Sequence, residues 1–138
     1  ITCLIATHDS TDALSFADQT IVLKNGKIHA KNTPEQLYNN PKDKYVASLF
    51  GDVNDLKLKN LISSESSRKK ILLYPHEIKI VGKSEIKARV LHSYFKGKSF
   101  LIKAVLKNEI IYFEHASEVE KGKEVFLKIS EKALRSRL

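Results

Sequence analysis

The stretch LIATHDSTDALSFADQTIVLKNGKI, residues 4–28, determines how the 138-residue chain is interpreted. It runs from an apolar segment through His8 into an acidic helix start and a hairpin signal. Residues 1–7 are β-branched and apolar without polar alternation, which is typical of a strand covered on both faces of a parallel sheet. The following fifty residues offer too few partner strands, and the chain contains no Met. We therefore expect that sequence upstream of Ile1 is missing.

Capping and turn signals predict three helices and a hairpin before residue 51. Asp9 or Ser10 can cap the first helix, because a short side-chain oxygen satisfies free backbone N–H groups. The Asn-Gly pair at 25–26 suits a type I′ turn between two strands. Thr33 can cap a second helix, and a third, opened by a proline, ends at Gly51.

Beyond residue 51 the pattern changes to short β-rich runs, which predict a small barrel or sandwich. The runs lie at 71–81, interrupted by Pro75, and at 86–95, 98–106, 109–115 and 124–130. Charge changes at the same place, because residues 1–50 are neutral and the whole excess of +8 lies in residues 51–138. We therefore expect two domains, 1–50 and 51–138.

Composition excludes several classes of protein. No apolar run approaches the roughly 18–20 residues that cross a bilayer, and no basic segment followed by an apolar one suggests a signal peptide. The single cysteine, Cys3, cannot form an internal disulfide, and its apolar surroundings predict a buried thiol in a reducing compartment.

Three motifs together resemble a known family. The order of His8, Asp12-Ala13-Leu14, Ala17-Asp18 and Asn25-Gly26-Lys27 resembles the end of the nucleotide-binding domain of ABC transporter ATPases. NTPEQLYNNPKDKYVASLFGDVN, residues 32–54, is similar to a stretch of importer ATPases that carry a C-terminal β-domain called TOBE. LLYPHEIKI, residues 72–80, resembles the R-P-E motif of that domain, with Tyr74 in place of the arginine and His76 inserted before Glu77. The resemblance is strongest to polyamine, iron, sulfate or maltose importers.

The resemblance implies an α+β fold. A remnant of an α/β ATPase domain, made of a strand, a helix, a hairpin and linker helices, would precede a small all-β, OB-like barrel of the TOBE type. It implies ATP and Mg²⁺ as cofactors of the full-length protein, and His8 as the switch histidine that contacts the γ-phosphate and helps orient the attacking water. Tyr38 and Tyr45 are expected to pack in the core with the linker helices.

The resemblance also implies the cellular setting. The full-length subunit would couple ATP hydrolysis to solute uptake as a homodimer bound to membrane-spanning permease subunits. It would be cytoplasmic and peripheral on the inner face of the cell membrane. The β-domain would regulate or stabilise the dimer.

The sequence also limits what this chain does alone. The phosphate-binding G-x-x-x-x-G-K-[ST] motif is absent, and so is an LSGGQ-like signature, so we expect no tight ATP binding or hydrolysis by this chain alone. His29, His76, His92 and His115 lack the spacing of zinc ligands, and we expect no metal site.

Two alternatives start from the basic β-domain. Its lysines and its aromatic residues could bind single-stranded nucleic acid, or a small anion. The first is disfavoured as a partner because Phe100, Tyr112 and Phe113 lie in apolar runs where core packing is expected. Lys residues at alternate positions are also typical of an ordinary solvated strand face.

Overall fold

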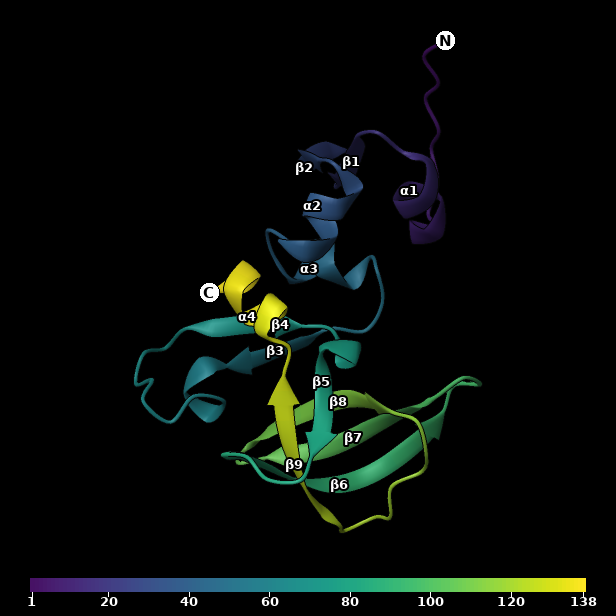
Figure 1. The fold of residues 1–138 in the computed structure, drawn as a ribbon. Helices are drawn as coiled ribbons and strands as arrows, with labels where there is room; N and C mark the ends of the chain where they lie inside the picture. The colour runs from purple at the N-terminus through teal and green to yellow at the C-terminus, as the bar shows by residue number, and fades with distance from the viewer. The chain divides into compact units, whose positions relative to one another are not determined.

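Helices α1–α4, strands β1–β9 and two short 3₁₀ helices form over residues 1–138 in the computed structural model (Figure 1). The chain divides into two units, residues 1–51 and residues 52–138. None of the helices has the length and apolar character that crossing a bilayer requires. The expected α+β class is confirmed, with helices and a mostly antiparallel set of strands.

The first unit follows the predicted order of helix, hairpin and helices. Each helix has the side-chain cap that its first residues require: Asp9 accepts from the backbone N–H of Thr11, and Thr33 accepts from that of Gln36. Its elements are α1 (Ser10–Phe16), β1 (Thr20–Lys24), β2 (Lys27–Asn32), α2 (Pro34–Asn39) and α3 (Lys44–Ser48). The third helix begins after the cap Asp43, rather than at Pro41.

The hairpin of the first unit turns where the Asn-Gly pair predicts. Asn25 and Gly26 both have positive φ, 53° and 74°, as a type I′ turn requires. The strands pair from Thr20↔Asn32 to Lys24↔Lys27, with one irregularity after Val22. A small core lies behind the hairpin and consists of Val22, Leu37 and Val46, with Ala30, Tyr45 and Phe50 packed against it.

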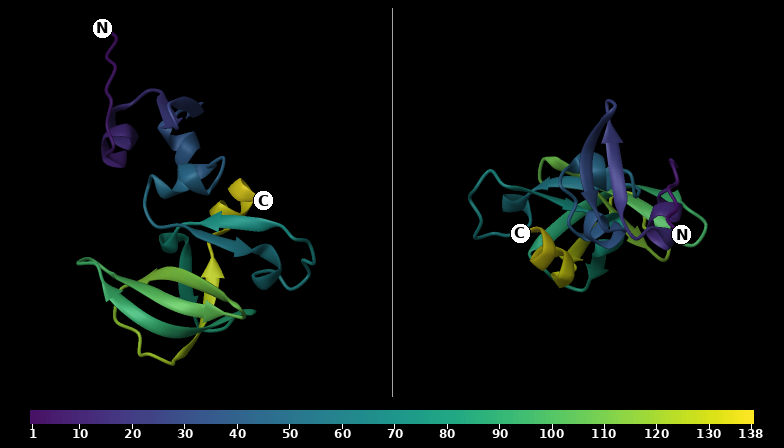
Figure 2. Two further views of the ribbon diagram at one scale, coloured as in Figure 1. Left: turned by 180° about the vertical axis from the view of Figure 1, so that it is seen from behind. Right: turned by 90° about the horizontal axis from the view of Figure 1, so that it is seen from above.

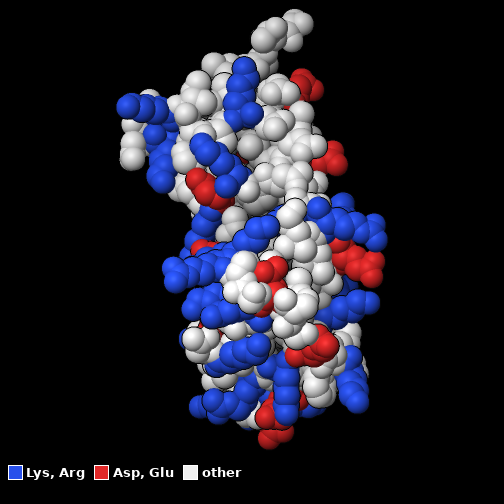
Figure 3. All heavy atoms as spheres, turned by 90° about the vertical axis from the view of Figure 1, so that its left-hand side faces the viewer, with Lys and Arg blue, Asp and Glu red and all other residues white.

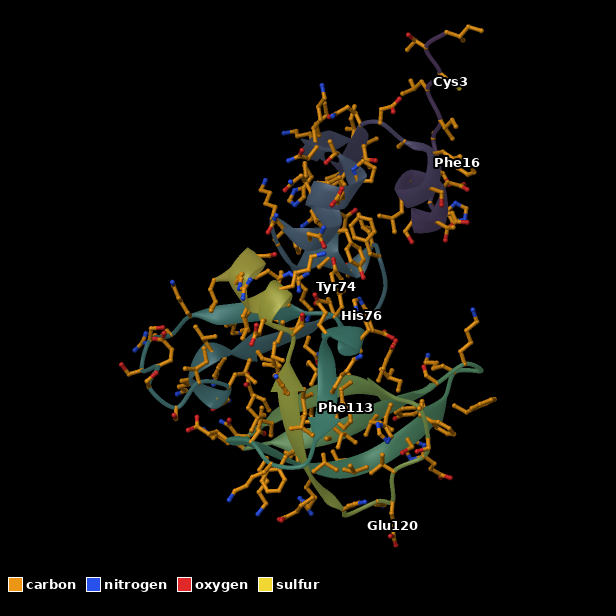
Figure 4. The ribbon with its side chains drawn as sticks, in the orientation of Figure 1. Cys3, Phe16, Tyr74, His76, Phe113 and Glu120 are labelled. Carbon is orange, nitrogen blue, oxygen red and sulfur yellow. The ribbon has the colours of Figure 1, made fainter.

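Residues 1–9 do not form the predicted strand. They form no helix or strand (Figure 2). The side chains of Ile1, Leu4 and Ile5 are exposed. A strand needs a neighbour for its backbone hydrogen bonds, and the only strands of this unit, β1 and β2, pair with each other. The prediction of a buried Cys3 is wrong for the same reason, because the thiol is exposed with the segment that carries it (Figure 4).

The second unit contains seven strands. β3 (Asn54–Lys57) pairs with β4 (Lys70–Leu73), and the other five form one antiparallel sheet in the order β5-β9-β6-β7-β8. Those five are β5 (Ile78–Val81), β6 (Ile86–Phe95), β7 (Phe100–Leu106), β8 (Glu109–His115) and β9 (Glu124–Ile129). The sheet does not close into the expected barrel, because no ladder joins its edge strands β5 and β8.

One continuous core fills the second unit. Phe113 on β8 is completely buried, among aliphatic residues from β3, β4 and the five-stranded sheet (Figure 4). The core extends to α4 (Glu131–Arg137), which the sequence analysis did not predict and which Ser130 caps. The short 3₁₀ helices η1 (Leu58–Asn60) and η2 (Pro75–Glu77) link β3 to β4 and β4 to β5.

A buried asparagine fastens the two-stranded sheet to β8. Asn54 donates to the carbonyls of Leu73 (3.1 Å) and Tyr112 (2.7 Å) and accepts from the Tyr112 N–H (2.8 Å). Glu109 adds to this junction by accepting from the Lys57 N–H and from the Asn60 side chain. These bonds satisfy backbone groups at the β8 edge that would otherwise lack partners.

Candidate functional site

His8 is exposed in the segment just before α1, and it makes no hydrogen bond within the chain. Asp9, the next residue, is occupied as the cap of that helix. An imidazole in this position can donate one hydrogen bond and accept another, so it is able to contact an external phosphate or water. The structure brings no other predicted site residue to it, because His8 was the only one.

The other histidines have ordinary partners in the fold. His29 bonds to Asp43, His76 stacks on Tyr74, and His92 lies against Tyr94 with ring centroids 4.4 Å apart. His115 is half-buried on β8. No group of three or more His, Cys, Asp or Glu side chains is arranged to hold a metal ion.

The His29–Asp43 pair holds the hairpin to α3. His29 Nε2 lies 2.7 Å from Asp43 Oδ2, and Asp43 Oδ1 accepts from the backbone N–H of Val46 at 3.0 Å. The Val46 N–H and the His29 imidazole hold the pKa of Asp43 below its ordinary value. Tyr45 packs edge-on to the His29 ring at 5.4 Å. The pair is therefore accounted for by helix capping and packing.

Tyr38 and Tyr45, which were expected to pack in the core, are only partly buried. Tyr38 meets Phe50 edge-on with ring centroids 5.4 Å apart. The Tyr45 hydroxyl reaches the Leu23 carbonyl at 3.0 Å. Tyr45 thus packs its ring beside the small core while its hydroxyl is hydrogen-bonded.

In the second unit an arginine lies beside Tyr74, the residue that stands where the R-P-E motif has its arginine. Arg137, from α4, lies over the Tyr74 ring at 5.0 Å from the centroid and forms an ion pair with Glu77. It also donates to the Leu72 carbonyl at 3.3 Å. Sequence reasoning missed Arg137, although Ser130, Glu131 and the arginines near the chain end were signals of a capped C-terminal helix.

The first unit exposes an unusual amount of apolar surface. Phe16 is 79% exposed, Ile5 66% and Ile28 65%, although aliphatic and aromatic side chains of this size are normally covered. Further exposed members are Ile1, Leu4, Leu14, Ile21, Leu23 and Leu49. Large exposed apolar patches mark surfaces that pack against other protein.

Comparison with known proteins supports the resemblance to ABC transporter ATPases. The chain is 30% identical over 148 residues to the spermidine/putrescine import ATP-binding protein PotA of Clostridium acetobutylicum, an alignment that covers 94% of this chain and 42% of that protein. Over nearly its whole length, the chain is therefore similar to the C-terminal part of ABC-type ATP-binding subunits. Proteins of the same name from Malacoplasma penetrans and Ureaplasma parvum are 28% and 29% identical, each over 92% of this chain. No protein-family model matches the chain.

The chain spans less than half the length of the ATP-binding subunits that it matches, 42%, 25% and 28% of the three proteins named above. The alignments include both units, since they cover more than nine-tenths of the chain. The phosphate-binding motif G-x-x-x-x-G-K-[ST] is absent from the chain.

Proposed function

We propose that this chain is the C-terminal region of a subunit that hydrolyses ATP to drive solute import, with polyamines as the solute class. The observation that carries the proposal is the near-complete alignment of the chain with polyamine-import ATP-binding proteins. The motif order from His8 to Gly51 supports the ATP-binding subunit, because it resembles the end of the nucleotide-binding domain of ABC transporter ATPases.

The exposed apolar surface of the first unit supports the same proposal. In the complete subunit, the rest of the nucleotide-binding domain covers Phe16 and its apolar neighbours. Residues 1–7 then complete the sheet of that domain as an interior strand, where their unpaired backbone groups gain partners. The half-buried Tyr38 and Tyr45 hold the linker helices to the same domain.

His8 is this chain's contribution to the nucleotide site. Bound ATP with Mg²⁺ supplies the phosphoanhydride whose cleavage drives transport, and His8 donates a hydrogen bond to its γ-phosphate. The imidazole is exposed and has no partner within the chain, so reaching a phosphate breaks no existing contact.

The second unit is proposed to regulate or stabilise a dimer of the subunit. The complete dimer docks on membrane-spanning permease subunits and is therefore cytoplasmic and peripheral to the membrane. The basic surface of the second unit, where Lys and Arg are widely spread (Figure 3), is compatible with binding a small anion.

A chimera tests the proposal. The chain replaces the matching 42% of the Clostridium acetobutylicum relative, so that the relative supplies the missing part of the nucleotide-binding domain. The chimera is expected to hydrolyse ATP, and His8→Ala is expected to lower kcat by about 10²–10³, as loss of one hydrogen bond to developing charge does.

His29→Ala is the matched control, because it removes an imidazole that serves the Asp43 cap and lies outside the proposed site. Its ATPase rate is expected to stay close to that of the unchanged chimera. A folded chimera whose activity does not respond to His8→Ala would overturn the role of His8. A folded chimera with no activity at all would overturn the assignment of this chain to an active ATPase.

A further inference from the structure

The β6–β7 hairpin of the second unit lies in a long segment without acidic residues. Residues 86–108 contain six Lys or Arg and no Asp or Glu. Of these six, only Lys87 pairs with a carboxylate, that of Glu124 at 2.8 Å. Arg89, Lys96, Lys98 and Lys107 are exposed. The hairpin is therefore a local concentration of positive charge that the fold itself does not neutralise.

Strand register places aromatic and basic side chains together on the outer face of this hairpin. Val90, Ile102 and Ala104 are buried, so the residues that alternate with them point away from the core. Across β6, β7 and β8, His92 lies opposite Lys103, which lies opposite Tyr112.

The next row of the same face is Tyr94, Leu101 and Glu114, which carries one acid. The third row is Arg89, Val105 and Ile110. The three rows together contain aromatic and aliphatic side chains, the cations Lys103 and Arg89, and one carboxylate, that of Glu114. The face therefore combines ring surface and positive charge.

The tip of the hairpin exposes more aromatic surface. Phe95 is 71% exposed and Tyr94 40%, and the Phe95 ring lies beside the half-buried Phe100, at 5.4 Å between centroids. Lys96 and Lys98 flank Gly97 in the turn, which projects from the sheet (Figure 1). Core packing, expected for Phe100, Tyr112 and Phe113, is complete for Phe113 and partial for the other two, and it does not extend to the exposed Tyr94 and Phe95.

We infer that the β6–β7 hairpin binds single-stranded nucleic acid, with bases stacked on Tyr94 and Phe95 and phosphates held by Lys96, Lys98 and Lys103. Sequence-tolerant binding of single strands needs this combination, aromatic faces for the bases and a cationic track for the backbone. Tyr94 and Phe95 are consecutive strand residues and point to opposite faces of the hairpin, so the bound strand crosses the tip past Lys96 and Lys98 and meets one ring on each side. The inference goes beyond the proposed transport function and involves only the second unit.

The exposed rings and the lysines together determine which ligand fits the hairpin. The lysines would attract an acidic protein or a small anion, but neither ligand would cover the two exposed rings. An apolar partner would use the rings, but it would leave the lysines facing a low-dielectric surface. Charge complementarity therefore selects a polyanion, and the exposed rings select one that carries planar bases.

Fluorescence anisotropy of the whole 138-residue chain with labelled oligo(dT) and oligo(U) of about 12 nucleotides tests the inference, because single-strand sites span about 4–16 nucleotides. Tyr94→Ala and Phe95→Ala are each expected to weaken binding about 5- to 100-fold without changing net charge. Lys96→Gln with Lys98→Gln is expected to reduce the slope of log affinity against log salt by about 1.4, at about 0.7 per phosphate contact.

Matched controls separate this site from general attraction to polyanions. Phe16→Ala removes an equally exposed ring from the first unit, and Lys79→Gln with Lys132→Gln removes two exposed charges outside the hairpin. Both controls are expected to bind within about twofold of the unchanged chain. Circular dichroism melts verify that each variant remains folded.

Three results would overturn the inference. The first is absence of oligonucleotide binding at low salt. The second is oligonucleotide binding that the aromatic substitutions leave unchanged, or binding of polyglutamate with equal affinity. Either result would mean that charge alone accounts for the binding. The third is stronger binding to vesicles of anionic phospholipid than to oligonucleotides, with the same dependence on Phe95.

Discussion

Arg137 and Glu77 form an ion pair across 60 positions of sequence, with their side chains only 6% and 11% exposed. The pair joins the last turn of α4 to the short helix η2. Glu77 also accepts from the Tyr74 N–H at 2.8 Å, and its own carbonyl accepts from the Ser130 N–H at 2.8 Å. The guanidinium thus helps to hold the chain's last helix against the turn between β4 and β5.

Arg137→Ala is expected to destabilise the second unit by about 3–5 kcal/mol, because it leaves the Glu77 carboxylate buried without its partner. Urea unfolding followed by circular dichroism measures the change. Arg135→Ala is the control: its ion pair with Glu131 is 81% and 70% exposed, and its loss is expected to cost less than about 0.5 kcal/mol. Equal effects of the two substitutions would contradict a special role for Arg137.

Asn54→Ala is expected to destabilise the second unit by about 2–3 kcal/mol. The substitution removes the side-chain partner of the Tyr112 N–H and of two carbonyls, those of Leu73 and Tyr112. Asn54→Asp retains the acceptor for the Tyr112 N–H but offers no donor to the carbonyls, so it should also destabilise. Hydrogen exchange at the Tyr112 amide gives a local measurement, and faster exchange is expected in the alanine variant only. Slow exchange in that variant would show that Tyr112 has another partner.

Sequence patterns predicted those elements whose signals are local. The bounds of β6 and β8 match the β-rich runs at 86–95 and 109–115, and the Asn-Gly pair gave the hairpin turn. These predictions succeed because alternation and turn chemistry depend on neighbouring residues. α4 carries equally local signals, a Ser cap and an acidic first turn, although the sequence patterns above do not include it.

Features that depend on distant residues could not be predicted in this way. The strand expected at residues 1–7 failed because an apolar run specifies a strand only where a partner edge exists. Arg137 meets Tyr74 through the fold of the whole second unit, which no spacing rule describes. The role of His8 came from the order of motifs around it, and it stays a prediction because this chain contains no other part of that site.

Stability of the first unit is expected to fall at acid pH through Asp43. The folded state holds the pKa of this carboxyl below its ordinary value of 3.8, mainly through the Val46 N–H, so the charged form is bound more tightly when folded. The stabilisation is therefore fully present above that value and is lost as pH falls through the lower folded-state pKa. Asp43→Ala removes a helix cap and should cost about 1 kcal/mol at pH 7 and much less near pH 2.

Asp43→Asn separates the cap from the charge. Asparagine caps a helix as well as aspartate does, so most of the stability at pH 7 should remain, while the acid-dependent part should disappear. Thermal melts at a series of pH values provide the measurement. If the asparagine variant lost stability at low pH as the unchanged chain does, another group would be responsible for the acid dependence.

The apolar surface of the first unit is expected to make this chain adhere to itself when its larger partner is absent. Phe16, Leu23 and Ile28 are each more than half exposed, and none belongs to the small core of Val22, Leu37 and Val46. Replacing those three exposed residues with Ser, Thr and Thr should reduce dye binding by 8-anilinonaphthalene sulfonate and self-association in sedimentation, with the helix content retained. Leu37→Ser, in the core, should instead increase dye binding and self-association by unfolding the unit, at a cost of about 2–5 kcal/mol.

In the chimera described above, the same three polar substitutions of exposed residues should weaken ATP hydrolysis, because there the surface packs against the rest of the nucleotide-binding domain. If the substituted chimera kept full activity, this surface would not be that interface.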